Sequence, residues 1–151
     1  MTLAEFLEQK NCGNLLAEYE DAWPRVANPA AVAALKDKKV QRAKTARQEH
    51  LIVLSLDSGA RIIKTRVVTI GLVNFSLVHP REVFSGAISD NAVSIILCHN
   101  HPSGSLEPSS EDIEITRRLK LSGEILGIRL LDHVIVSSDG FYSFQEKSGL
   151  F

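Results

Sequence analysis

From residue 48 onward, segments typical of β-strands alternate with segments typical of helices, and this order limits the chain to folds that mix the two. The run at residues 92–98 barely alternates between apolar and polar residues, which indicates a strand buried on both faces. We therefore predict an α/β fold of three layers with a mixed central sheet. The expected strands are Leu51–Leu56, Arg61–Ile70, Ala92–Cys98, Leu130–Val136 and Phe141–Phe144, and the expected helices are Pro80–Ala87 and Asp112–Leu121, the latter ending near Gly123.

The segment before residue 48 is predicted to be helical. Residues 1–27 form an expected N-terminal helical extension, in which apolar residues recur at roughly helical spacing before Trp23-Pro24 closes it. A second helix is expected to start at Asn28, an N-cap residue followed by proline, and to run through Leu35 into a basic stretch. Residues 28–151 are then the main domain.

Composition excludes several classes of protein. A chain of 151 residues, 44% apolar and 23% charged, can bury enough surface to fold without disulfides or a structural metal. Its two cysteines, Cys12 and Cys98, form no disulfide framework, which favours a reducing compartment. The first residues carry acid where a secretory signal carries base, and no apolar run approaches the ~20 residues that span a bilayer. We expect a cytoplasmic protein.

The segment most informative about chemistry begins where the buried strand ends. His99 and His101 are two residues apart, so their side chains point to the same side. The following loop, residues 102–108, contains two prolines and a glycine and can bring Asp112 beside the imidazoles. Two nitrogens and one carboxylate oxygen, with a fourth position for water, are the ligands of a catalytic zinc site. Cys98 faces the opposite side and is expected in the core.

These residues also have structural interpretations. The run from Ser109 to Asp112 resembles a capping box, and a single histidine is more often structural than a ligand. A His-x-His at the mouth of a buried strand, followed by Ser-x-x-Asp, has little structural reason to occur. The pattern therefore favours a metal site.

The same stretch resembles the signature of the JAMM (JAB/MPN) metalloproteases, which is His-x-His, seven residues, then Ser-x-x-Asp. Here His99 and His101 are followed by residues 102–108, then Ser109 and Asp112, without departure. The longer sequence His-Asn-His-Pro-Ser-Gly, with residues 79–84 upstream and Asp132-His133 downstream, is similar to the RadC branch of that superfamily. The resemblance covers about residues 28–151.

This resemblance implies a cytidine-deaminase-like αβα fold and a zinc ion bound by His99, His101 and Asp112. The implied reaction is hydrolysis of a peptide, isopeptide or related amide bond, with Ser109 hydrogen-bonding the tetrahedral oxyanion. A donor of this kind can contribute ~3 kcal/mol. The substrate is then a peptide or protein, whose identity the sequence does not give.

The superfamily also requires a glutamate that moves a proton between water and the leaving amine. Glu49, directly before the strand at residues 51–56, fits its position, and a carboxylate near a cation suits that role. Glu82 is the competitor, but it lies at an expected helix start, where a carboxylate complements the helix dipole. We favour Glu49. The pair Asp132-His133 either orients a zinc ligand or is an ordinary strand-end pair.

A second hypothesis is a DNA-repair or other DNA-associated accessory protein whose metal is structural or vestigial. With a net charge of -1 the chain has no overall basic character, and residues 1–27 are too short for the helix-hairpin-helix that precedes longer relatives. A basic stretch is the candidate for weak nucleic-acid contact, although it also fits the solvated end of a helix: Lys36, Lys38, Lys39, Arg42, Lys44 and Arg47. Attack on nucleic acid, as in zinc deaminases, ranks last because their His-x-Glu and Cys-x-x-Cys patterns are absent.

Overall fold

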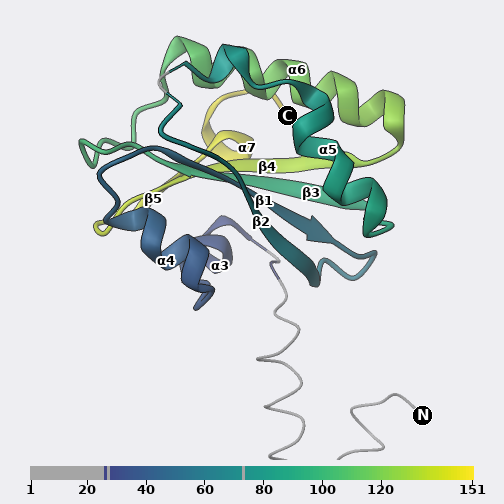
Figure 1. The fold of residues 1–151 in the computed structure, drawn as a ribbon, viewed down its shortest axis with the longest axis horizontal. Coiled ribbons are helices and arrows are strands. Elements are labelled where there is room, and N and C mark those ends of the chain that lie inside the picture. Colours follow the sequence, from purple (N-terminus) through teal and green to yellow (C-terminus); the bar gives the residue numbers. More distant parts are fainter. Residues whose placement is uncertain (1–25, 27, 73) are drawn as a thin grey trace, which may run out of the picture.

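The computed structural model describes residue 26, residues 28–72 and residues 74–151, and a five-stranded sheet lies at its centre (Figure 1). The strand order is β2-β1-β3-β4-β5. Strand β1 pairs antiparallel with β2 and β3, β3 pairs parallel with β4, and β4 pairs antiparallel with β5, so the predicted mixed sheet is confirmed. The strands are β1 His50–Leu56, β2 Ile62–Ile70, β3 Ser94–Asn100, β4 Arg129–Val136 and β5 Phe141–Ser143.

Helices cover both faces of this sheet, which makes the three predicted layers (Figure 1). Helices α5, Pro80–Ser89, and α6, Ser110–Leu126, pack on one face, and α3, Pro29–Ala33, and α4, Lys38–Lys44, pack on the other. A 3-10 turn, η1 at Phe75–Leu77, and a final short helix, α7 at Phe144–Lys147, complete the described elements. We refer to the two faces as the α6 face and the α4 face.

Strands β1 and β3 are buried along their whole length because each contributes to both apolar layers. Ile95 and Leu97 of β3 join the core on the α6 face, whereas Ile96 and Cys98 join the core on the α4 face. This double burial explains why the sequence of β3 does not alternate. It also confirms the prediction that Cys98 is a core residue.

Several predicted boundaries differ from those in the structure. The single helix expected from Asn28 into the basic stretch is two helices, because α3 ends at Ala33 and Asp37 caps α4 by accepting the N–H of Lys39. Strand β3 begins at Ser94 and continues through Asn100, since its ladder with β4 extends to the pair Asn100 and Val136. The last strand stops at Ser143, whose side chain caps α7.

Helix α6 extends beyond the predicted end at Gly123. It stops before Gly127, which has a φ of 73°, a left-handed conformation that glycine adopts without strain. Gly123 lies inside the helix, and the N–H of Ile128 returns to donate to its carbonyl at 2.9 Å. A Cβ at this position would collide with the carbonyl oxygen of Ile128, so Gly123 permits a close approach and is not a helix stop.

The predicted N-terminal extension, residues 1–27, lies outside the described residues apart from Val26. That residue is buried on the α4 face, and its N–H donates to the carbonyl of Ala60 at 3.0 Å. Among the described helices, none combines the length and the apolar character needed to cross a membrane.

Candidate metal centre

The end of strand β3 places two imidazoles side by side on the α6 face. His99 is fully buried within the strand, and His101 follows it, partly exposed. The Nε2 atoms of the two rings lie 3.0 Å apart. The nitrogen Nδ1 of His101 contacts the carbonyl of Ser105 at 2.9 Å, which holds the ring toward its neighbour. The prediction that both histidines point to one side is confirmed.

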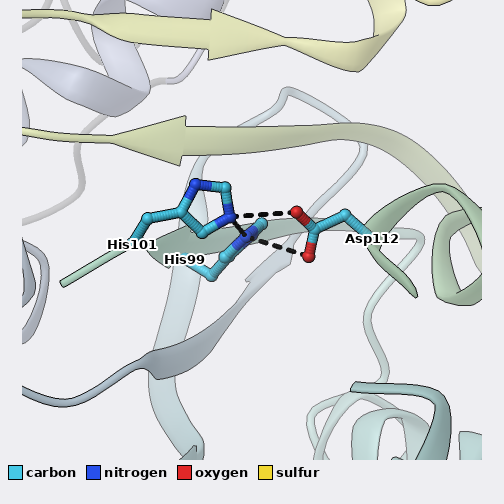
Figure 2. A group of neighbouring side chains, drawn as sticks. All are labelled: His99, His101 and Asp112. Atoms are coloured by element: carbon cyan, nitrogen blue, oxygen red, sulfur yellow. Dashed lines mark hydrogen bonds and ion pairs between the residues drawn. The ribbon is translucent and has the colours of Figure 1, made fainter. Parts of the chain in front are cut away.

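Helix α6 brings a carboxylate to the same place (Figure 2). Asp112 Oδ2 lies 2.9 Å from His101 Nε2, and Asp112 Oδ1 lies 3.2 Å from His99 Nε2. Asp112 also completes a capping box with Ser109, since Oδ2 accepts the Ser109 N–H at 2.9 Å and Ser109 Oγ accepts the Asp112 N–H at 3.1 Å. The capping and cluster interpretations are therefore both true of the same side chain.

The three side chains fit a small divalent cation. One ligand atom from each of His99, His101 and Asp112 lies within 4.8 Å of the other two. Ligand atoms held 2.0–2.1 Å from a tetrahedral zinc are roughly 3.3 Å apart, close to the separations of 2.9–3.2 Å among these nitrogens and oxygens. Among the described residues, no fourth histidine, cysteine or carboxylate joins this group.

The environment of the cluster favours a neutral His99 beside an anionic Asp112. Burial lowers the pKa of His99. Burial would by itself raise the pKa of Asp112, but its contacts with His101 and His99 outweigh this, and the pKa is lowered. The hydrogen bond with Asp112 raises the pKa of the less buried His101. Asp112 is thus ionised at neutral pH, the form that binds a cation.

Glu49 lies next to this cluster, directly before strand β1. Burial raises the pKa of the Glu49 carboxyl. The charge of His101 opposes this shift and the charge of Asp112 adds to it, so Glu49 interacts electrostatically with both residues. A pocket of about 340 Å³ adjoins it, lined in part by Glu49, Leu72 and Pro102. The backbone of Glu49 is held on both sides by the side chain of Asn100.

Asn100 is buried between the two histidines in sequence, and its side chain bonds β1. Its Oδ1 accepts the N–H of His50 at 2.7 Å, and its Nδ2 donates to the carbonyl of Gln48 at 3.1 Å. These two residues flank Glu49. Sequence reasoning did not single out Asn100, because nothing local shows that β1 and β3 are neighbours.

Glu82, the competitor of Glu49, occupies a capping position. Its carboxylate accepts the N–H of His79 at 3.1 Å in the capping box of α5, and its side chain is exposed. This is the structural role expected for it from the sequence.

The pair Asp132-His133 divides between the two faces of β4. His133 Nε2 lies 2.6 Å from His99 Nδ1, whereas Asp132 points to the α4 face and accepts from Ser143 Oγ at 2.7 Å and from the N–H of Gln145 at 3.0 Å. Only the histidine therefore contacts a candidate ligand. Thr116, which also contacts His133, was missed, although its position four residues after Asp112 places it on the same helix face.

The comparison with protein families agrees with this site. Residues 26–150 match the family model of the RadC-like JAB domain. The chain belongs to the RadC-like JAB domain family. The resemblance drawn from the His-x-His and Ser-x-x-Asp residues is thereby confirmed.

The chain is also similar to curated proteins of several organisms. The chain is 52% identical over 111 residues to a UPF0758 protein of Methanospirillum hungatei, covering 74% of this chain and 48% of the relative. It is 45% identical over 128 residues to a UPF0758 protein of Clostridium perfringens, covering 85% and 55%. It is 51% identical over 120 residues to one of Streptococcus pyogenes, covering 80% and 50%. The chain spans about half the length of the curated relatives it matches.

Two other predicted features of the RadC-like JAB domain lie away from the cluster. Cys98 is on the α4 face, and burial raises the pKa of its thiol to about 12, so it is neither a ligand of this site nor a reactive thiolate. The basic stretch includes helix α4, which packs on the α4 face as well, and Lys39 Nζ donates there to the carbonyl of Thr65 at 2.8 Å. The sheet thus separates α4 from the candidate metal centre.

Proposed function

We propose that this RadC-like JAB domain is a zinc-dependent hydrolase that cleaves peptide, isopeptide or related amide bonds. The observation that carries the proposal is the convergence of His99, His101 and Asp112, with Glu49 beside them. Three protein ligands with one position left over are typical of catalytic rather than structural zinc. When bound, zinc supplies Lewis acidity, which activates water and polarises a carbonyl near neutral pH.

In this proposal Glu49 moves the proton. Its carboxylate accepts a proton from the attacking water as the C–O bond forms, and returns it to the nitrogen as the C–N bond breaks. A pKa raised by burial suits this role, because such a carboxyl binds the proton more readily than an exposed one and can still release it.

Ser109 is the proposed donor to the oxyanion of the tetrahedral intermediate. In the capping box its Oγ acts as acceptor for the Asp112 N–H, which uses a lone pair and not the hydroxyl proton. Capping and oxyanion stabilisation are therefore chemically compatible in one serine.

Cleavage of a peptide library by the zinc-loaded protein in ¹⁸O-labelled water tests this function. We expect new C-termini that carry ¹⁸O with the parent and with Glu82→Gln, and none with Glu49→Gln, although all three proteins bind zinc. Equal cleavage by Glu49→Gln would show that another group is the base. If the zinc-loaded parent cleaves no amide in the library, the hydrolase assignment is wrong.

A further inference from the structure

The two ring nitrogens of His99 have different surroundings. Nε2 faces the cluster, whereas Nδ1 lies 2.6 Å from Nε2 of His133. Both rings are fully buried. A neutral imidazole has one N–H donor and one bare nitrogen, so the hydrogen bond between the rings decides which nitrogen of His99 is left to bind a metal.

The direction of that hydrogen bond follows from Thr116. Thr116 Oγ1 lies 2.6 Å from the carbonyl oxygen of Asp112 and 2.6 Å from His133 Nδ1. A carbonyl oxygen can only accept, so the single hydroxyl proton of Thr116 goes to Asp112. Thr116 Oγ1 then offers only a lone pair to His133, whose Nδ1 must carry the proton.

The remaining bonds are fixed in turn. His133 with a proton on Nδ1 has a bare Nε2, which accepts from His99, and His99 therefore carries its proton on Nδ1. Its Nε2 is bare and points toward His101 and Asp112. If Thr116 instead donated to His133 Nδ1, the hydrogen bond between the two rings would also run the other way. His99 would then present an N–H where a cation must bind.

We propose that Thr116 and His133 are positioning residues that hold His99 as the Nδ1–H tautomer, with the lone pair of Nε2 directed at the metal. The proposal rests on the metal site of the proposed function, and it does not depend on which bond is hydrolysed. Partners of this kind commonly orient a ligating histidine and strengthen metal binding.

Packing keeps the two rings in place. Phe144 stacks on His133 with ring centroids 4.7 Å apart and an interplanar angle of 10°, and Phe75 meets His99 edge-on at 5.0 Å. Asp112 lies at both ends of this hydrogen-bond network, because its backbone carbonyl accepts from Thr116 and its carboxylate lies beside His99. One turn of α6 thus supplies the candidate ligand Asp112 and fixes the tautomer of His99.

The tautomer can be measured directly in the metal-free protein. Long-range ¹H–¹⁵N correlation spectra of protein with ¹⁵N-labelled histidine distinguish the two neutral tautomers of each ring. We expect both His99 and His133 to carry the proton on Nδ1, with His133→Gln used to assign their signals. A His99 ring protonated on Nε2 would overturn the proposal, whether or not the protein hydrolyses anything.

The consequence for metal binding is tested with Thr116→Val and Thr116→Ser. The valine removes the hydroxyl at nearly constant volume, and the serine restores it. We expect Thr116→Val to weaken zinc binding by at least about tenfold and Thr116→Ser to restore it to within about twofold of the parent, measured by competition with a chromophoric chelator.

Thr65→Val is the matched control, because it removes a hydroxyl from a buried threonine of β2 outside the network. A purely structural role of Thr116 would lower the melting temperature and leave zinc affinity unchanged, and that result would contradict the proposal. If Thr116→Val does not fold, the spectra of the parent decide. If the parent binds no zinc, the proposed function fails separately, while the spectra still report the tautomer.

Discussion

Asp112 serves both a helix and a candidate metal site with one carboxylate. Its Oδ2 accepts the Ser109 N–H and also contacts His101, while Oδ1 faces His99. The capping bond fixes the side chain relative to α6, so the carboxylate does not have to be ordered when an ion binds. Ordering in advance reduces the cost of binding.

Asp112→Asn separates these two functions. The amide oxygen can still accept the Ser109 N–H, but the negative charge is lost. We therefore expect the metal-free fold to persist and zinc affinity to fall by more than the roughly 10–100-fold typical of losing an outer partner. Metal analysis after dialysis measures the affinity, and circular dichroism without metal checks the fold. Glu111→Gln, which neutralises the exposed neighbouring acid, is the control. Full zinc occupancy in Asp112→Asn would show that this carboxylate is not a ligand.

Asn100 is expected to hold the backbone around Glu49. Asn100→Ala removes both bonds to β1, so the amide of His50, which donates to Oδ1, should exchange with solvent faster by at least about tenfold. Hydrogen exchange followed by NMR measures this, with the amide of Leu54 in the centre of β1 as reference. Zinc binding should be kept, since no ligand atom is removed. An unchanged His50 amide would show that the β1–β3 ladder alone fixes this segment.

At the residue scale, local sequence patterns predicted the cluster of candidate ligands but not the residues around it. His99, His101 and Asp112 lie within one continuous stretch, where strand alternation and helix capping are readable. The contact of His133 with the site depends on the pairing of β4 with β3, and the bonds of Asn100 depend on the pairing of β1 with β3. No local sequence pattern predicts these pairings. Alternation does place Asp132 and His133 on opposite faces, but it does not say which face holds the site.

Among the elements, the strands were predicted better than the helix ends. The apolar runs of β1 and β3 fix their identity, and the turn at residues 138–140 fixes the hairpin of β4 and β5. The split between α3 and α4 was missed, because alanine and lysine both favour helix and hid the cap at Asp37. In the sequence Gly123 is typical of a helix stop, and its contact with the following turn exists only in three dimensions.

That contact gives a prediction for α6. A Cβ on Gly123 would lie 2.3 Å from the carbonyl oxygen of Ile128 and 3.3 Å from the ring of Phe84. The backbone at Ile128 cannot move aside easily, so we expect Gly123→Ala to lower the free energy of unfolding by about 2 kcal/mol, despite the better helix propensity of alanine. Urea denaturation measures the loss. Glu124→Ala, on the adjacent exposed residue, should change the free energy little; equal stability of Gly123→Ala and the parent would mean that the turn can shift.

For the whole molecule, the position of the site follows from the topology of the sheet. Strands β3 and β4 are parallel neighbours, and α6 connects them, as crossover helices do. The end of β3 and the start of α6 therefore meet at the carboxyl edge of this parallel pair, where α/β folds commonly bind ligands. The sequence predicted a mixed sheet but not the order β2-β1-β3-β4-β5, which depends on pairings between distant segments.

An ion at this junction should stabilise the molecule as a unit, because it joins the central strand to the longest described helix. At a free zinc concentration about 100 times the dissociation constant, binding to the folded state alone adds about 2.7 kcal/mol, and for a chain of this size that corresponds to a rise in melting temperature of roughly 5–10 °C. Thermal unfolding with zinc and with a chelator measures the rise. We expect His101→Ala to lose it and Glu111→Ala, which removes the neighbouring exposed acid, to keep it. A rise of the same size in His101→Ala would mean that the stabilising ion binds elsewhere on the chain.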